Sequence, residues 1–167
     1  MATSKAYLAT PETAVTFRSS TGTVAHTLTS LATLTGRQSA QHDFGTSARA
    51  FMFNWRAWCK FTTTPVVGET VDWYYKSGLT TSTILDNDDG TGDIALSSVD
   101  KLKNLHYIGS IIVDQAADVE FVASGSIVIY EQFIHIVCYN ATADDLSATA
   151  LDMGFSLTPL SIQGQAT

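Results

Sequence analysis

The sequence has little charge and no long apolar run, and each shortage excludes a class of protein. Charged residues make up 15% of the 167 residues, and the net charge is −7. An acidic chain lacks the basic surface that non-specific nucleic-acid binding requires, so we expect no nucleic-acid partner. No apolar stretch reaches the ~18 residues needed to span a bilayer. We therefore expect no membrane partner. Residues 1–10 also lack the apolar core of a signal peptide, so we expect no export signal.

Cysteine and histidine are too sparse to predict a metal or cofactor site. Cys59 and Cys138 are the only cysteines, and both lie in strand-like runs. A disulfide between them is possible, but in a chain without an export signal we interpret them as two free buried thiols. They are too few and too far apart for a zinc centre. The four histidines are His26, His42, His106 and His135. No two of them stand two or four positions apart, the spacing that a pair of metal ligands on one strand or helix would have.

Motifs typical of enzymes are also missing. The chain has no Gly-x-Ser-x-Gly elbow and no phosphate-binding loop. Glu131 could be one carboxylate of a glycosidase pair, but nothing in the pattern singles out a second. His135 lies in the most apolar run, so we expect it to be a hydrogen-bonded core residue and not a base. The sequence therefore predicts a protein without catalytic activity.

The acidic loop from Asp86 to Asp93 is the one segment whose composition suggests calcium. Its carboxylates and glycines resemble a calcium-binding loop. The spacing of an EF-hand fails, however, because Ser98 stands at the twelfth position when Gly92 takes the sixth, where a bidentate glutamate is required. We expect a solvated loop tip, and the sequence leaves open whether it binds calcium.

The strongest pattern in the chain is an alternation between residues 51 and 61. The odd positions read Phe, Phe, Trp, Ala, Cys, Phe, and the even positions read Met, Asn, Arg, Trp, Lys. Successive side chains of a strand point to opposite faces, so this segment predicts a long strand, from about residue 48 to residue 63, with one aromatic buried face. The opposite face, which carries Arg56 and Lys60, meets water or a partner.

Similar patterns predict an almost wholly β protein. Residues 71–76 alternate, and residues 133–139 are apolar on both faces apart from His135, as in a central strand covered on both sides. Residues 97–104 suggest a helical turn. Turn signals recur every 8–15 residues, which is typical of an antiparallel β-sandwich or jelly roll. Further strands are expected at 13–18, 24–28, 106–113, 119–123, 127–129 and 148–157, with a turn or bulge at 124–126 and a tight hairpin turn at 130–132.

We expect one sandwich domain with extended termini. The domain covers residues 13–157, with a polar N-terminal arm at 1–12 and a polar C-terminal tail at 158–167. Two aromatic residues, Trp58 and Tyr74, fall opposite to the predicted core faces of their strands. They could stack on sugars or pack in a subunit interface, where Trp and Tyr are enriched. We favour an interface that also contains Arg56 and Lys60, in a homo-oligomer with a trimer as the favoured form.

Short motifs between residues 26 and 148 resemble small virion proteins of tailed bacteriophages. These motifs are Leu28-Thr29-Ser30-Leu31-Ala32, Gly36-Arg37-Gln38-Ser39, Thr64-Pro65, Phe121-Val122-Ala123 and the strand 133–140 with Asn140-Ala141-Thr142. The members of this group are all-β proteins, some of which decorate or cement capsids.

The resemblance implies a structural virion protein that binds the outer capsid surface and stabilises the shell. Its partner would be the major capsid protein, and its location the virion after assembly in the host cytoplasm. The group offers no catalytic residues to carry over. The alternative is a carbohydrate-binding or tail-fibre-associated β-sandwich module that uses Trp58 and Tyr74.

Overall fold

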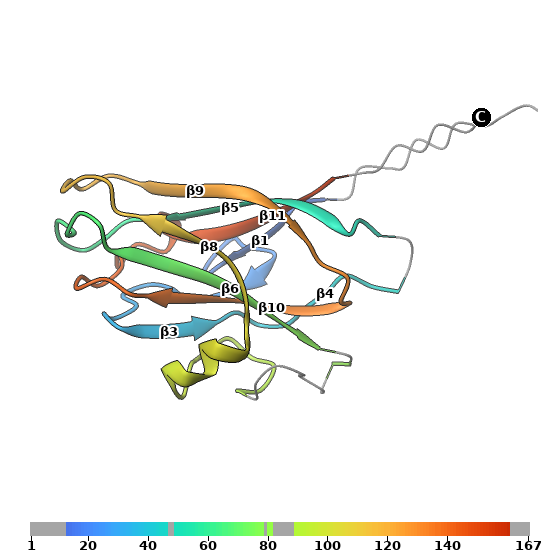
Figure 1. The fold of residues 1–167 in the computed structure, drawn as a ribbon. Helices are drawn as coiled ribbons and strands as arrows, with labels where there is room; N and C mark the ends of the chain where they lie inside the picture. Colours follow the sequence, from blue (N-terminus) through green and yellow to red (C-terminus); the bar gives the residue numbers. More distant parts are fainter. Residues whose placement is uncertain (1–12, 47–48, 79, 82–88, 161–167) are drawn as a thin grey trace, which may run out of the picture.

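A computed structural model describes residues 13–46, 49–78, 80–81 and 89–160, which form two facing sheets (Figure 1). Sheet A contains, in spatial order, β2 (Val24–Ala25), β1 (Val15–Arg18), β11 (Gly154–Pro159), β5 (Met52–Cys59) and β9 (Phe121–Val128). Sheet B contains β7 (Ile94–Ala95), β3 (Thr35–Gln38), β10 (Phe133–Asn140), β6 (Thr70–Gly78) and β8 (His106–Ile112), with β4 (His42–Asp43) paired to β10. The predicted all-β sandwich is confirmed.

The connections between the main strands give this sandwich the topology of a jelly roll. The strand order β1-β11-β5-β9 in sheet A faces the order β3-β10-β6-β8 in sheet B, and all these pairs are antiparallel. The chain changes sheet at every step between these eight strands except the step from β6 to β8. Two interleaved four-stranded sheets of this kind are the jelly-roll arrangement.

The strand directions place four connections at one end of the sandwich, on the left of Figure 1. We call this the loop end, and it consists of residues 19–34, 60–69, 113–120 and 141–153. The opposite end holds residues 129–132, together with the start of β1 and the end of β11, and β3 and β6 also end there. The loop end is therefore separated from the start of β1 and the end of β11 by the length of the sandwich.

Strand β5 confirms the predicted alternation but is shorter than expected. Phe53, Trp55, Ala57 and Cys59 are buried in the core between the sheets, whereas Phe51 is exposed just before the strand. The chain leaves the sheet after Cys59, because the Lys60 carbonyl accepts the Ser147 N–H at the loop end. Phe61 is still buried, in an isolated bridge with Leu146.

The indole of Trp55 fills a space that two glycines leave open. A Cβ atom at Gly125 in β9 would lie 2.9 Å from Nε1 of Trp55, and one at Gly109 in β8 would lie 2.9 Å from its Cη2. The same indole stacks on Phe155, with ring centroids 6.0 Å apart. The expectation of a turn or bulge at 124–126 is therefore wrong. These residues lie inside β9, and Gly125 is there because a larger residue would displace the tryptophan.

The outer face of sheet B is partly covered by the segment that contains the 3-10 helix η1 (Val99–Asn104), which bears out the predicted helical turn. The Gln38 amide donates to the carbonyls of Gly90 and Gly92, at 3.0 and 2.8 Å, and its oxygen accepts from Lys76 at 2.6 Å. Leu96 packs over Gly36. This cover explains why β10 is apolar on both faces, as the sequence indicated.

Several boundaries differ from the sequence-based expectations. The segment 129–132 is not a hairpin turn, because it carries the chain from β9 in sheet A to β10 in sheet B. Strand β11 begins only at Gly154, after the 3-10 helix η2 (Ala150–Asp152), and it includes two residues assigned to the tail, Thr158 and Pro159. The short strands β3, β4 and β7 were not predicted. The proposed arm at residues 1–12 and the rest of the tail, from 161 on, lie outside the described residues.

Both cysteines are free and buried, as predicted. Burial raises the pKa of the Cys59 thiol to about 12, and it raises the pKa of Cys138 well above the ordinary value. A thiol with a raised pKa is a poor nucleophile, because the thiolate is the reactive form. The two residues therefore act as small apolar core residues.

Trp55→Ala is expected to lower the free energy of unfolding by roughly 3–5 kcal/mol, because it removes a buried aromatic ring from between two glycines. The control is Arg56→Ala, at the next position on the exposed face, which should cost less than about 1 kcal/mol. Urea denaturation of both variants measures the difference. Small and equal losses would show that the faces of β5 are assigned wrongly.

Candidate functional site

The four residues predicted to form an interface lie on different parts of the molecule. Arg56 and Trp58 are on the outer face of sheet A, and Lys60 follows β5 at the loop end. Tyr74 is on the outer face of sheet B, on the far side of the sandwich. The structure thus brings Arg56, Trp58 and Lys60 to one region and separates Tyr74 from them.

Trp58 is on the predicted face, but its own chain covers it. Its side chain is only 6% exposed and lies against Gly154, where a Cβ atom would be 2.4 Å from the ring. The guanidinium groups of Arg18 and Arg56 lie over the indole, at 5.7 and 5.2 Å from its centre, and its N–H donates to the Leu151 carbonyl at 3.3 Å. Trp58 therefore offers almost no surface for a sugar or a subunit.

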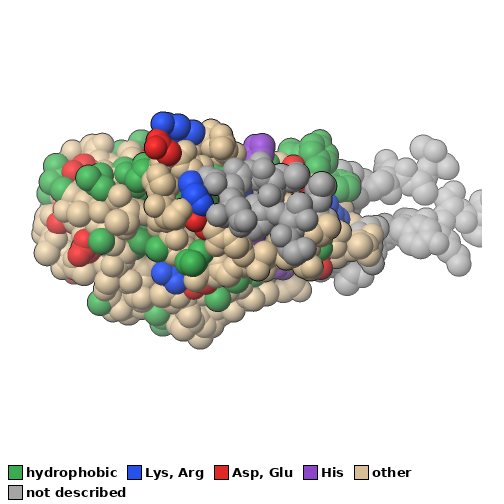
Figure 2. Space-filling model, turned by 90° about the horizontal axis from the view of Figure 1, so that it is seen from below, with side chains coloured by type: hydrophobic (Ala, Val, Ile, Leu, Met, Phe, Trp, Pro, Cys, Tyr) green, Lys and Arg blue, Asp and Glu red, His purple; other side chains and the backbone are tan. Residues whose placement is uncertain are grey.

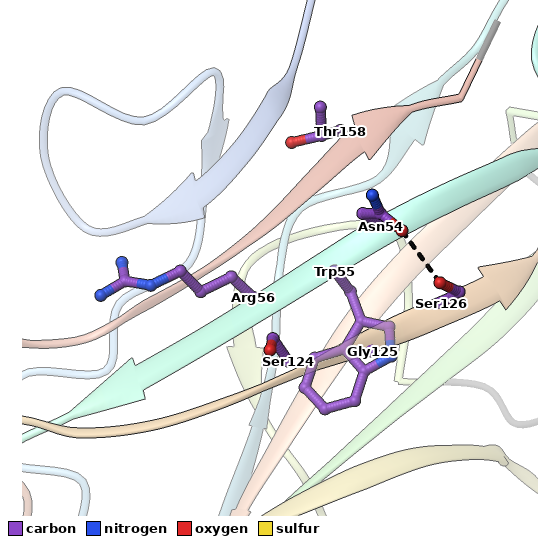
Figure 3. Close-up of a pocket in the computed structure, with 7 residues that line it drawn as sticks. All are labelled: Asn54, Trp55, Arg56, Ser124, Gly125, Ser126 and Thr158. Atoms are coloured by element: carbon purple, nitrogen blue, oxygen red, sulfur yellow. Dashed lines mark hydrogen bonds between the residues drawn. The ribbon is translucent and has the colours of Figure 1, made fainter.

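A shallow depression of about 400 Å³ lies beside Arg56 on the outer face of sheet A (Figure 3). The side chains of Asn54 and Ser126 point toward one another there, and the serine hydroxyl donates to the amide oxygen at 2.9 Å. The lining is completed by residues of β5, β9 and β11: Trp55, Arg56, Ser124, Gly125 and Thr158. Since Trp55 points into the core, its backbone and that of Gly125 form the floor.

This depression can bind polar groups, but it lacks the groups for acid–base chemistry. Its lining provides hydroxyls, an amide and one guanidinium, and none of the lining residues is an acid or a histidine. Arg56 also forms an ion pair with Glu120 at 2.8 Å, and a guanidinium group donates hydrogen bonds but accepts none. The depression therefore suits hydrogen bonding to a polar ligand.

The loop end is braced by hydrogen bonds between all four of its connections. The amide of Ser30 donates to the Ser147 carbonyl, and that of Thr62 donates to the Asp145 carbonyl, both at 3.0 Å. The amide of Gly68 donates to the Val113 carbonyl at 2.8 Å. The Asn140 side chain adds bonds to the carbonyls of Leu31 and Asp144. Loops tied together in this way present a fixed surface.

The braced loop end also carries exposed apolar side chains. Five of them are more than half exposed: Leu34, Val66, Val67, Leu151 and, where β8 ends, Ile112. Figure 2, which views the molecule from below Figure 1, shows hydrophobic side chains recurring at this left-hand end. Exposed apolar residues gathered on one part of a surface mark an interaction site more often than scattered ones do.

Tyr74 belongs to a second cluster, on the outer face of sheet B. Its ring packs edge to face against Tyr107, with centroids 5.4 Å apart. Burial, with a further contribution from the charge of Asp72, raises the pKa of the Tyr74 hydroxyl. The alternation of residues 71–76 indicates Tyr74 as an outward-facing residue, but no local pattern indicates Tyr107 or Asp72, because their meeting depends on how the strands pair.

The polar residues considered for catalysis or metal binding have structural roles. His135 is fully buried and donates from Nδ1 to the Ser39 carbonyl at 2.9 Å, as expected of a hydrogen-bonded core histidine. Glu131 accepts the backbone N–H of Tyr130 at 3.2 Å. Within the described ranges, no three side chains of His, Cys, Asp or Glu are grouped so that they could hold a metal ion.

The described end of the acidic loop is not a solvated tip, which corrects that expectation for two aspartates. Asp89 pairs with Lys101 at 2.5 Å, and Asp93 pairs with Arg37 at 2.6 Å. Burial acts to raise the pKa of Asp93, but hydrogen bonds from Thr27 and Arg37 outweigh it and leave that pKa below its ordinary value. Residues 82–88 lie outside the described residues, so the calcium question stays open for them.

Comparison with known proteins assigns this chain to no family. The sequence matches no protein-family model and no curated protein. The likeness to phage virion proteins therefore stays a prediction. In the part of the chain that the structure describes, no helix has the length and apolarity to cross a membrane.

Two buried histidines should make stability fall in mild acid. His26 donates from Nε2 to the Arg37 carbonyl at 3.1 Å, and burial lowers the pKa of both His26 and His135 to about 4. In the unfolded chain both titrate near 6.5, so the unfolded state binds more protons as the pH falls from about 6.5 to about 4. Each histidine should then cost on the order of 1–3 kcal/mol of stability across that window.

Urea midpoints at about pH 7.5 and pH 4.5 measure this effect. The lowered pKa of Asp93 contributes only below about pH 4, because an ordinary aspartate titrates there, and so it does not mimic the histidines. The variant His135→Gln should reduce the pH dependence even if it lowers absolute stability. An equal midpoint at both pH values would contradict the assignment of two neutral buried imidazoles.

Proposed function

We propose that the protein is a structural virion protein of a tailed phage, a decoration protein that binds the outer capsid surface and reinforces the shell. The observation that carries the proposal is the loop end, where rigid, hydrogen-bonded loops hold exposed apolar side chains. A protein that reinforces a shell must present a fixed surface to its neighbour, because a mobile surface would lose entropy on binding.

The side chains of the loop end suit a contact between two proteins. Val66 and Val67 stand in a loop whose Gly68 amide is bonded to the Val113 carbonyl, so both are held in place. The core of a protein–protein interface is apolar and poor in charge, with a polar rim. Here the apolar residues lie beside Asp114, Asp118 and Asp145, which are exposed on the same connections.

The fold supports the same proposal by analogy. Jelly rolls occur in viral capsid proteins and in lectins, where they provide a rigid body with loops at both ends. This analogy supports only the architecture, because one fold can serve many functions. The functional proposal therefore depends on the loop end. The major capsid protein is the proposed partner, on the capsid surface of the virion, and the protein is proposed to act without catalysing a reaction.

A carbohydrate-binding or tail-fibre-associated module remains the second candidate. The depression beside Arg56 favours it, because hydroxyl and amide groups line it and sugars are recognised by such groups. Trp58 no longer supports this candidate, since its ring is covered. A glycan that binds to the wild type and is lost in Asn54→Ala would favour this role over decoration.

Replacing both valines of the loop end, Val66→Asp with Val67→Asp, should abolish or strongly weaken binding to capsids that lack the protein. Burying two carboxylates in an apolar contact costs several kcal/mol, whereas both positions are exposed in the free protein, so the fold should survive. Co-sedimentation with capsids measures binding. The matched control is Val128→Asp, at an exposed valine near the other end of the sandwich, which should bind normally.

The wild-type protein should also raise the temperature at which particles release DNA. Particles with and without it are heated, and release is followed with a DNA dye. Equal release temperatures, together with labelled protein found at the tail in electron micrographs, would contradict the decoration role.

The protein should form a homo-oligomer, and a trimer is the favoured form. The reason is that an isolated copy leaves five large apolar side chains at the loop end, and Phe51 and Met52 near the other end, exposed to water. Light scattering coupled to size-exclusion chromatography gives the mass directly. A single monomeric species at micromolar concentration would show that these residues do not drive self-association.

A further inference from the structure

Three tyrosines and one aspartate occupy neighbouring positions on the outer face of sheet B. Tyr139 of β10 stands opposite Asp72 of β6, and Asp72 stands opposite Ser110 of β8. Two residues further along β6, and so on the same face, Tyr74 stands opposite Tyr107. Tyr107 is 58% exposed, and Tyr74 and Tyr139 are partly exposed. We call these five residues the tyrosine face.

A β-bulge creates this arrangement. The pairing of β6 with β8 shifts between Trp73 and Tyr74, so that Gly109 faces Trp73 but Tyr107 faces Tyr74, with Ile108 as the extra residue. Regular alternation would have placed Ile108 on the outer face and turned Tyr107 inward. The bulge thus re-aims Tyr107 outward, and bulges that re-aim a side chain are frequent next to functional sites.

The Asp72 carboxylate is oriented but not neutralised. It accepts a hydrogen bond from the Ser110 hydroxyl, which is bonded in turn to the Tyr107 hydroxyl at 2.6 Å. Within the described part of the chain, no lysine or arginine forms an ion pair with Asp72. A partly buried carboxylate beside three aromatic rings makes a region of negative potential, because ring faces also carry negative charge density.

Aromatic side chains elsewhere in this protein are contacted by its own arginines. Three of its four arginines lie over aromatic rings: Arg18 and Arg56 over Trp58, and Arg49 over Phe44 and Phe51. The fourth, Arg37, is held by Asp93. The tyrosine face is therefore an aromatic cluster for which the chain has no arginine left.

We propose that the tyrosine face binds an arginine side chain presented by a partner protein. The guanidinium group would stack on the exposed ring of Tyr107 and donate hydrogen bonds to the free oxygen of Asp72. Arginine fits better than lysine, because its planar group both stacks on a ring and donates two parallel bonds to a carboxylate. A neutral sugar could also stack there, but it would leave the carboxylate charge uncompensated.

The test is a titration of the full-length protein with N-acetylarginine amide, followed by shifts of backbone amide signals in NMR spectra. The amides of Asp72, Tyr74, Tyr107 and Ser110 should shift together, and the apparent affinity should fall as salt is added. The matched probe is N-acetylcitrulline amide, which has nearly the same shape without the charge, and it should give no comparable shift. N-acetyllysine amide, free at its side chain, should bind more weakly than the arginine probe.

Two pairs of variants locate the site. Tyr107→Ala should weaken binding about two- to five-fold, as expected for one exposed cation–π contact. Asp72→Asn, which keeps an acceptor for Ser110, should weaken binding about five-fold or more. The controls are Tyr130→Ala and Asp118→Asn, which change an exposed tyrosine and an exposed aspartate outside the tyrosine face and should leave binding unchanged.

Four results would overturn the proposal: no shift with the arginine probe, equal shifts with the citrulline probe, tighter binding of the lysine probe, or equal binding by Asp72→Asn. Methyl glycosides that shift the same amides without the arginine probe doing so would assign the face to sugars. The proposal is independent of the loop end, because none of these variants alters Val66 or Val67. Its failure is therefore distinguishable from a failure of the decoration role.

Discussion

The packing of Trp55 between two glycines is the contact on which the rest of the sandwich depends. The residue belongs to sheet A, yet its indole reaches Gly109 of sheet B. One side chain thus joins the two sheets near their edge strands, β9 of sheet A and β8 of sheet B. From there aromatic contacts continue through Phe155 to Trp73 of sheet B, with ring centroids 6.0 and 5.2 Å apart, and on to His26. Because interiors are close-packed, this row of rings fixes the distance between the sheets and the face that each strand turns inward.

Once the inward faces are fixed, strand alternation decides which side chains face outward, but it does not decide whether they are exposed. Arg56, Trp58 and Tyr74 all point away from the core, as the sequence indicated. Trp58 is nevertheless buried, because Gly154 opposite it leaves room for the ring to lie flat and two arginines cover it. Tyr74 stays partly exposed, with Tyr107 of β8 packed edge to face against its ring. The functional difference between these two aromatic residues thus arises from their neighbours on adjacent strands.

The sequence could predict the elements with strong local patterns and could not predict their pairing. The alternation through Phe53, Trp55 and Ala57 located β5, and the two-sided apolarity of residues 133–139 identified β10 as a covered central strand. The short strand β3, with the sequence Thr-Gly-Arg-Gln, has no apolar alternation, so no local pattern predicts it. It forms a strand because it pairs with β10. The role of Gly125 and the meeting of Tyr107 with Tyr74 depend on strand register, and the second depends on a bulge, which a pattern with a period of two cannot contain.

The few charged residues of the sequence are largely paired within the folded chain. With only nine lysines and arginines, the chain commits every arginine to an aromatic ring or an aspartate of its own, and Lys101 and Lys103 to aspartates. Some of these pairs join different elements, and the pair of Arg37 in β3 with Asp93 fixes a loop against a sheet. Among the described residues, a carboxylate that forms no ion pair within the chain is available to bind a cationic side chain of a partner. Asp72 is such a carboxylate, and a rigid sheet holds it among hydroxyls and rings, where a partner's cation would displace little water and order little chain.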